Sequence, residues 1–260
     1  MNARLSDWNP EQYLALADER ARPALDLIAR IPNRIPKLVH DLGCGPGNST
    51  TLLARAFPQA TLTGLDSSSA MIAKAKRTLP TAKFIVGDVT QWQPHAEADI
   101  VFSNAMFHWV PQHGRQLQRI LESLKPGAIF AVQMPDSQAE PSHVQMAKVA
   151  GKPAFSGKLS KAAAARTPLL SPQGYHQLLY PQCTSLELWH TRYLHRLKGH
   201  RGIIDMLSTT GLRPYLDPLA TEKRAAFLKD YEHAIASHYP LMDDGTLLYP
   251  FPRLFIMAVR

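Results

Sequence analysis

Cysteine is scarce in this sequence, and long apolar runs are missing from it. The 260 residues include two cysteines, Cys44 and Cys183, which lie far apart along the chain. This argues against a disulfide framework or a zinc site. No apolar stretch approaches the roughly 18 residues of a membrane-spanning helix, and the first ten residues lack the apolar core of a signal peptide. We therefore expect a cytoplasmic protein without a membrane anchor or bound metal.

The sequence contains more basic than acidic residues. Its 29 lysines and arginines outnumber its 21 aspartates and glutamates, which gives a formal net charge of +8. Such an excess can serve solubility alone, or it can attract an anion, either a nucleic acid or a small acidic substrate. Charge by itself does not choose between these functions. The hydrophobic fraction of 45% is enough for the core of one large α/β domain or two small ones.

Short apolar runs alternate with helical patterns between residues 37 and 134. The expected strands are 37–42, 61–65, 83–86, 98–103 and 128–134, and the expected helices are 49–57, 67–79 and 112–124. Strands and helices that alternate at this spacing indicate a parallel sheet with helices on both faces.

The flanking regions are less regular. Residues 10–30 have helical spacing, and Pro23 predicts a break into two helices. Residues 141–186 contain five basic residues and no acidic one. Within them, the stretch 156–165 is low in complexity, and we interpret it as a solvated loop rather than a mobile lid. Strands are expected at 185–197 and 253–259, with helices at 203–208 and 222–237.

The stretch from residue 37 to residue 50 is typical of a strand, a tight turn and a helix start. The strand ends near Asp41, and Gly43, Gly45 and Gly47 follow at alternate positions before Asn48 opens the helix. Glycine allows positive φ angles and a close approach of a ligand to the main chain. The free N–H groups of a helix start point toward such a ligand. The stretch therefore predicts a site for a nucleotide-like cofactor.

Polar residues also follow the next three predicted strands, at the edge where open parallel sheets bind ligands. Asp66 is placed to accept hydrogen bonds from ribose hydroxyls. Asp88 can accept a hydrogen bond from an adenine amine, and Val89 can pack on the ring. Asn104 ends the fourth strand, next to the reactive end of the cofactor.

The glycine spacing favours one cofactor over another. Dinucleotide-binding loops have the pattern G-x-G-x-x-G, whereas this loop has G-x-G-x-G with Asp41 two residues before Gly43. An acid so close to the loop would repel a pyrophosphate, but it suits a ligand with an ammonium and a sulfonium group. The residues thus point to S-adenosylmethionine rather than NAD. The alternative, that the acids are ordinary strand-end caps, fits poorly with three acids and three glycines in this order.

Residues 41–47, Asp-Leu-Gly-Cys-Gly-Pro-Gly, resemble motif I of class I S-adenosylmethionine-dependent methyltransferases. Over essentially the whole chain, the sequence is similar to the trans-aconitate 2-methyltransferase family. The matching segments are 8–13, 22–27, 47–50, 64–68, 133–136, 140–143, 189–195, 210–214 and 250–256. The last two are the most specific and lie outside the generic methyltransferase core, so they bear on the substrate.

The resemblance implies a Rossmann-like α/β fold. Its sheet would have seven strands in the order 3-2-1-4-5-7-6, with strand 7 antiparallel. Residues 1–260 would form one domain, with a helical cap at 1–36, a cofactor-binding core at 37–135 and a helical insertion at 198–245 covering the substrate. The implied reaction is methyl transfer from S-adenosylmethionine to a carboxylate of a small polycarboxylic acid, trans-aconitate above all, giving a monomethyl ester.

The motif and the reasoning above give one set of cofactor-binding residues. They are Asp41, Gly43, Cys44, Gly45, Gly47, Asn48, Asp66, Ser67, Asp88, Val89 and Asn104. For the substrate we expect Arg213 and Arg253 first, because guanidinium groups bind carboxylates with two hydrogen bonds. Trp8, Tyr13, Arg22 and His195 are further substrate candidates. No catalytic base is expected, and for His195 a structural role is favoured over a catalytic one.

The chain departs from the family pattern at several positions. Ser137 and Gln138 stand where the family usually has Asn-Trp, Met206 stands where a Trp is usual, and His108 stands where Gln is usual. The loss of two aromatic residues leaves open a different small acid as the substrate. An amine or a hydroxyl acceptor is a further alternative, and a hydroxyl would need a base such as His108 or His195.

Two other classes of protein remain as alternatives. A nucleic-acid methyltransferase is disfavoured, because Asn104 is not followed by the Pro-Pro-aromatic sequence that holds a flipped base. A cofactor-binding module without catalysis is disfavoured by the intact acids and glycines of the loop. The sequence does not indicate an oligomeric state.

Overall fold

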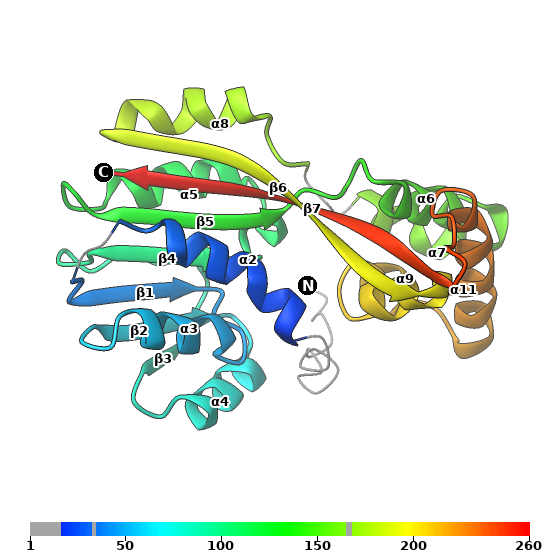
Figure 1. The fold of residues 1–260 in the computed structure, drawn as a ribbon, viewed down its shortest axis with the longest axis horizontal. Helices are drawn as coiled ribbons and strands as arrows, with labels where there is room; N and C mark the ends of the chain where they lie inside the picture. Colours follow the sequence, from blue (N-terminus) through cyan, green and yellow to red (C-terminus); the bar gives the residue numbers. More distant parts are fainter. Residues whose placement is uncertain (1–16, 33–34, 165–167) are drawn as a thin grey trace. The chain divides into compact units, whose positions relative to one another are not determined.

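The computed structural model in Figure 1 describes residues 17–32, 35–164 and 168–260. The chain forms two compact units. The sheet unit comprises Ala17–Pro135, Leu169–Thr191 and Arg253–Arg260, and the helical unit comprises Asp136–Pro168 and Arg192–Pro252. The predicted insertion at 198–245 falls within the helical unit. The expected division into cap, core and insertion of one domain stays a prediction.

The sheet unit is organised around one sheet. Among the described residues its strands are β1 (Leu38–Leu42), β2 (Thr61–Asp66), β3 (Lys83–Val86), β4 (Ile100–Asn104), β5 (Ile129–Pro135), β6 (Ser185–Lys198) and β7 (Thr246–Val259). Their order is β3-β2-β1-β4-β5-β7-β6. The first five strands are parallel and β7 is antiparallel to β5, which confirms the predicted topology.

Helices cover both faces of this sheet. On one face α2 (Ala17–Arg30) contacts α3 (Asn48–Ala56) and β5, and α3 contacts α4 (Ser69–Thr78). On the other face α5 (His113–Glu122) packs against α8 (Pro172–Leu179), with the short helices η1 (Phe107–Trp109) and η2 (Tyr180–Gln182) beside α5. The buried core on this second face joins side chains of the strands, α5 and α8 and none of α2, α3 or α4.

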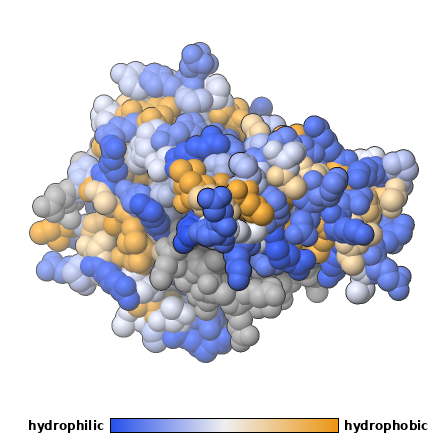
Figure 2. Space-filling view, turned by 45° about the vertical axis from the view of Figure 1, so that its right-hand side comes forward, coloured by the Kyte–Doolittle hydropathy of each residue, from blue (hydrophilic) through white to orange (hydrophobic). Residues whose placement is uncertain are grey.

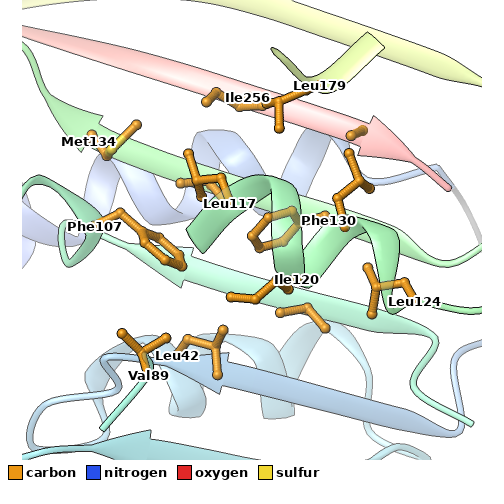
Figure 3. Close-up of a cluster of buried hydrophobic side chains, with 14 of the residues drawn as sticks. Leu42, Val89, Phe107, Leu117, Ile120, Leu124, Phe130, Met134, Leu179 and Ile256 are labelled. Carbon is orange, nitrogen blue, oxygen red and sulfur yellow. The ribbon is translucent and has the colours of Figure 1, made fainter. Parts of the chain in front are cut away.

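Figure 3 shows this core, in which Leu117 and Ile120 of α5 lie over Phe130 of β5 and Leu42 of β1. All four side chains are fully buried. Alternate residues of a strand point to opposite faces, so Leu42 faces α5, whereas Asp41 faces α3. This alternation turns the acid of β1 toward the helix that follows the glycine loop.

The helical unit has a core of its own. Within the described part of the chain its helices are α6 (Pro141–Ala150), α7 (Pro153–Ala164), α9 (Gly199–Ser208), α10 (Arg213–Leu216) and α11 (Thr221–Ala236). Helix α11 packs on α6 and α9, and α10 contacts α7 and α9. Phe227 and Tyr231 of α11 are fully buried in this core, together with Tyr249 from the first part of β7.

The expected loop at 156–165 is wrong, because α7 covers residues 156–164. The wider region 141–186, for which no helix was predicted, also contains α6, α8 and η2. Pro141 and Pro153 are first residues of helices, where the missing N–H of proline costs no hydrogen bond. Met146, Val149 and Leu159 are buried in the helical core. The apolar face of α6 and α7 was difficult to recognise in the sequence, because its residues are separated by lysines and small residues.

Two further predictions need correction. Pro23 does not divide the described helix, because α2 runs through it from Ala17 to Arg30 with Pro23 buried. Strand β7 begins at Thr246 rather than at residue 253. Its pairing with β5 starts at Arg253, so Pro250 and Pro252 lie where β7 has no β5 neighbour, and proline is tolerated at such an unpaired edge. The other expected elements are confirmed with ends shifted by a few residues.

The face shown in Figure 2 is mainly hydrophilic, and its hydrophobic residues form separate small groups. No helix within the described part of the chain has the length and apolar character needed to cross a membrane.

Candidate cofactor and substrate site

The loop between β1 and α3 has the conformation that its glycines predict. Gly43, Gly45 and Gly47 have φ angles of 72°, 53° and 92°, values in the left-handed region that favours glycine. The N–H groups of Gly43 and Cys44 both donate to the carbonyl of Leu65, over 2.8 and 3.0 Å. These bonds fix the loop to the end of β2. A Cβ on Gly45 would meet nothing within 4 Å, so the loop is open at this residue.

Asp41 lies at the base of this loop and is 1% exposed. Its Oδ2 accepts hydrogen bonds from the hydroxyls of Ser49 and Thr50, both over 2.7 Å, whereas its Oδ1 is buried and has no partner among the described residues. Burial raises the pKa of Asp41 to about 6, the two hydroxyls oppose this rise, and the nearby carboxylate of Asp66 adds to it. An unsatisfied buried polar atom costs about 1–3 kcal/mol. A cationic ligand would satisfy Oδ1.

Asp66 is held at the end of β2 by backbone donors. Gly45 N–H donates to Oδ2 and Ser68 N–H to Oδ1, each over 2.9 Å. Burial raises the pKa of Asp66, and these two hydrogen bonds oppose the rise. Each carboxylate oxygen has a second lone pair, so Asp66 is oriented to accept two more hydrogen bonds. Ser68 also caps α4 by accepting a hydrogen bond from Met71 N–H.

The structure places the remaining cofactor candidates around the same edge of the sheet. Asp88 is exposed just beyond β3 and accepts a hydrogen bond from Thr90 N–H over 2.8 Å. Val89 is 8% exposed and belongs to the core under α5. Ser67 is exposed after β2, and Asn48 is the first residue of α3. The side chain of Cys44 packs with Phe84 and Ile72, which leaves its backbone on the loop side.

Asn104 and Arg253 extend this edge across the sheet. Asp41 pairs with Phe102 of β4, and Asn104 lies two residues further along the same face. Asn104 pairs with Gln133 of β5, and Pro135, two residues after Gln133, pairs with Arg253 of β7. The side chains of Asp41, Asn104 and Arg253 therefore share the α2 and α3 face of the sheet. Arg253 is 6% exposed.

The other described substrate candidates belong to both units. Arg22 is exposed on α2 of the sheet unit. Arg213 and His195 belong to the helical unit. Arg213 begins α10, and its Nη2 lies 3.6 Å from Oδ2 of Asp217. His195 is 6% exposed, and its ring centroid lies 5.9 Å from that of Phe251.

Trp8 and Tyr13 lie outside the described residues, and all of the expected site assignments stay predictions. No group of His, Cys, Asp and Glu that could hold a metal ion occurs within the part of the chain that the structure describes.

One residue of this face was not singled out from the sequence. Gln133 is 0% exposed, and neither Oε1 nor Nε2 of its amide has a partner among the described residues. One signal was its place within a matching segment, Gln-Met-Pro-Asp at 133–136. A polar residue inside a buried strand of otherwise apolar residues was the physical clue, because buried amides are normally hydrogen-bonded.

Comparison with solved structures shows where this fold occurs. A putative methyltransferase from Bacillus halodurans superposes with a TM-score of 0.58 at 12% identity, covering 92% of this chain and 98% of that one. A phosphoethanolamine N-methyltransferase 2 from Haemonchus contortus, in complex with S-adenosyl-L-methionine, has a TM-score of 0.55 at 15% identity, covering 92% and 52%. A protein-family model described as a methyltransferase domain matches residues 39–127. The fold and the glycine loop define a class I S-adenosylmethionine-dependent methyltransferase.

Sequence relatives narrow this class. Over 256 residues the chain is 49% identical to a trans-aconitate 2-methyltransferase of Methylobacterium nodulans, covering 98% of this chain and 99% of the relative. The proteins of the same name from Rhodopseudomonas palustris and Escherichia coli are 46% and 43% identical, each over 98% of this chain and at least 99% of their own length. The chain belongs to the trans-aconitate 2-methyltransferase family.

Proposed function

We propose that this protein transfers the methyl group of S-adenosylmethionine to a carboxylate of trans-aconitate and forms a monomethyl ester. One observation carries the proposal most directly. In a chain of this family, the buried carboxylate of Asp41 has an unpaired oxygen at the base of an open glycine loop. A cation is the ligand that such an oxygen favours.

The residues at the sheet edge fit each part of the cofactor. Asp41 would hold the ammonium group and the N–H groups of the loop would hold the carboxylate, while Asp66 would accept hydrogen bonds from the ribose hydroxyls. Asp88, exposed beyond β3, would accept a hydrogen bond from the adenine amine. When bound, S-adenosylmethionine supplies a methyl group on a positively charged sulfur. Asn104, at the end of β4, would lie next to this reactive end.

The acceptor needs little chemical activation from the protein. A carboxylic acid with a pKa near 4 is already ionised at pH 7, so no general base is required. The chain has to orient the acid, which is worth up to about 7–11 kcal/mol in favourable cases, and to keep water from the nucleophilic oxygen. Arg253, buried on the same face as Asp41, can hold a carboxylate that does not react. Arg213 is proposed to hold another.

The departures from the family pattern favour a second candidate, a different small acid. Ser137, where the family usually has Asn, is 4% exposed, and its hydroxyl lies 3.2 Å from Nε2 of His143. Met206, in place of the usual Trp, is 4% exposed within the helical core. The substitution at 206 thus fits the packing of that core. Ser137 makes a buried polar contact, and the proposal is that the substitution at 137 bears on the choice of acid.

The decisive experiment is a transfer assay with methyl-labelled S-adenosylmethionine and a panel of acids. Trans-aconitate, cis-aconitate, citrate, isocitrate, succinate and fumarate should be compared at equal concentration, and the ester located by mass spectrometry. We expect the highest kcat/KM with trans-aconitate. Product with another acid and none with trans-aconitate would refute the substrate. Cofactor binding without transfer to any acid would indicate a binding module.

Two further parts of the proposal concern partners and location. The protein is proposed to act in the cytoplasm on a small anionic substrate, without nucleic acid or membrane as a partner. The net charge of +8 supports attraction of an acid with several negative charges. A gel shift with RNA that disappears with added salt would contradict this use of the charge.

A further inference from the structure

The amide of Gln133 is the least satisfied polar group on the α2 and α3 face of the sheet. The side chain is 0% exposed, and neither amide atom has a hydrogen-bond partner among the described residues. Buried amides in native proteins are normally paired, and each exception calls for an explanation. A ligand that reaches the amide is one such explanation, and a buried water is another.

The neighbours of Gln133 explain why the protein does not satisfy it. In the sheet Gln133 lies between Asn104 of β4 and Phe255 of β7. The side chain of Phe255 has no hydrogen-bonding atom, and its ring is stacked on Trp189, with centroids 4.9 Å apart and planes 6° apart. On the other side, Oδ1 of Asn104 is also buried without a partner among the described residues. Two adjacent amides therefore have unused hydrogen-bonding capacity.

The place of this pair in the sheet points to the acceptor acid rather than to the cofactor alone. Asp41, the proposed partner of the cofactor's ammonium group, lies on β1, and β4 and β5 follow β1 in the sheet. Arg253 lies on β7, on the same face of the sheet as Gln133. It pairs with Pro135, which follows Gln133 by two residues along β5. An acid held by Arg253 and methylated next to Asn104 would extend over Gln133. The amide Nε2 can donate to a carboxylate, and Oε1 can accept from a bridging water.

We propose that Gln133 is a substrate-binding residue that donates a hydrogen bond from its amide to a carboxylate of the acid, with Asn104 beside it. The inference rests on the proposed methyl transfer to a small polycarboxylic acid. Since Gln133 is covered and Asn104 is half-buried, the carboxylate approaches from the Asn104 side. Without acid, the amide is a buried group that the fold carries at a cost.

The cost of burying this unpaired amide distinguishes a substrate-binding role of Gln133 from a structural role. Gln133→Met keeps the length of the side chain and removes the unpaired amide, so the cofactor-free protein should melt at the same or a higher temperature than the wild type. A structural glutamine satisfied by a buried water would instead lower the melting temperature when replaced. Gln133→Glu, which keeps the shape, is the second variant if the methionine variant does not fold.

The experiment combines kinetics with binding. In Gln133→Met, KM for trans-aconitate should rise about ten- to a hundredfold, since a hydrogen bond to a charged group is lost. Binding of propane-1,2,3-tricarboxylate in the presence of S-adenosylhomocysteine, measured by calorimetry, should weaken by a similar factor. The affinity for S-adenosylhomocysteine should stay within about twofold of the wild type. Gln118→Met is the matched control. Gln118 lies on α5, which covers the opposite face of the sheet, and its amide donates a hydrogen bond to Glu122 of the same helix.

The outcomes distinguish this inference from the proposed function. If the wild type methylates the acid and Gln133→Met keeps the wild-type KM and tricarboxylate affinity, Gln133 does not bind the substrate, while the proposed function stands. A wild type that methylates no acid of the panel refutes the proposed function first. A Gln133→Met protein that loses cofactor affinity as well would assign the amide to the cofactor and overturn the inference.

Discussion

Met106 occupies the space that a side chain on Gly43 would need. A Cβ built on Gly43 would lie 2.3 Å from Cγ and 2.4 Å from Cβ of Met106. Gly43→Ala should therefore lower the free energy of unfolding by about 2 to 5 kcal/mol, because alanine is strained in a left-handed backbone and its Cβ would clash with Met106. Gly45→Ala, at a φ of 53° but in open space, should cost only about 1–2 kcal/mol. Urea denaturation of the two variants tests this, and equal losses would contradict the role of Met106.

Gly45 also allows a separate test of the loop as a cofactor site. Gly127 has a φ of 80° and, like Gly45, nothing within 4 Å of an added Cβ, but it lies in the turn before β5. Gly45→Ala and Gly127→Ala should lose similar stability. Only Gly45→Ala should weaken S-adenosylmethionine binding, by about tenfold or more, because a methyl group then stands where the cofactor approaches the main chain. Isothermal calorimetry measures both affinities, and equal affinities would argue against the loop.

Cofactor binding should depend on pH through Asp41. Its pKa is raised from 3.8 to about 6 by burial, so below pH 6 the carboxylate of the cofactor-free protein becomes protonated and loses its attraction for an ammonium group. The affinity for S-adenosylmethionine should then fall about tenfold between pH 7.5 and pH 5. Calorimetry across this range, with S-adenosylhomocysteine as a second ligand that keeps the ammonium group, checks the prediction.

The same raised pKa also affects the stability of the cofactor-free protein. As the pH rises, this contribution to stability decreases, whereas the affinity for the cofactor increases. A raised pKa means that the folded protein holds the proton more tightly than the unfolded chain. The stabilising effect is complete below pH 3.8 and is lost as the pH rises through about 6. Ionised Asp41 thus costs up to about 3 kcal/mol at pH 7.5.

Asp41→Asn provides the matched control for both effects of pH. Its amide oxygen can still accept from the hydroxyls of Ser49 and Thr50. We expect this variant to be more stable than the wild type at pH 7.5 without cofactor and to bind the cofactor weakly. Its cofactor affinity and its stability should both depend less on pH. A variant that binds as tightly as the wild type would contradict the ionic role of Asp41.

The sequence predicted the alternation of strands and helices and the glycine loop, because both depend on local patterns. The strands that contain Asp41, Asp66 and Asn104 near their ends are short apolar runs, and positive φ angles favour glycine, so the residue pattern alone indicated these features. The family resemblance supplied the order of all seven strands and the antiparallel direction of β7, which periodicity does not encode. Residues 141–186 were missed because the apolar face of α6 and α7 consists of widely spaced residues among lysines and alanines.

Features that depend on packing against distant residues could not be predicted. Pro250 and Pro252 argued against a strand before Arg253, yet β7 tolerates them because β5 does not pair there. The unpaired amide of Gln133 is visible only once its strand neighbours are known. Similarly, the contact between Met106 and Gly43 joins the end of β4 to the loop after β1, and nothing in either segment alone indicates it.

Arg213 and Arg253 should contribute to acid binding through the shape of their side chains as well as their charge. Lysine keeps the positive charge but cannot form two parallel hydrogen bonds to a carboxylate. Arg213→Lys and Arg253→Lys should therefore each raise KM for the acid by about tenfold and leave the affinity for S-adenosylmethionine nearly unchanged. Arg115→Lys, an exposed arginine on α5, is the control and should behave as the wild type. Steady-state kinetics and calorimetry separate the two effects, and a loss of cofactor affinity in both variants would refute their assignment to the substrate.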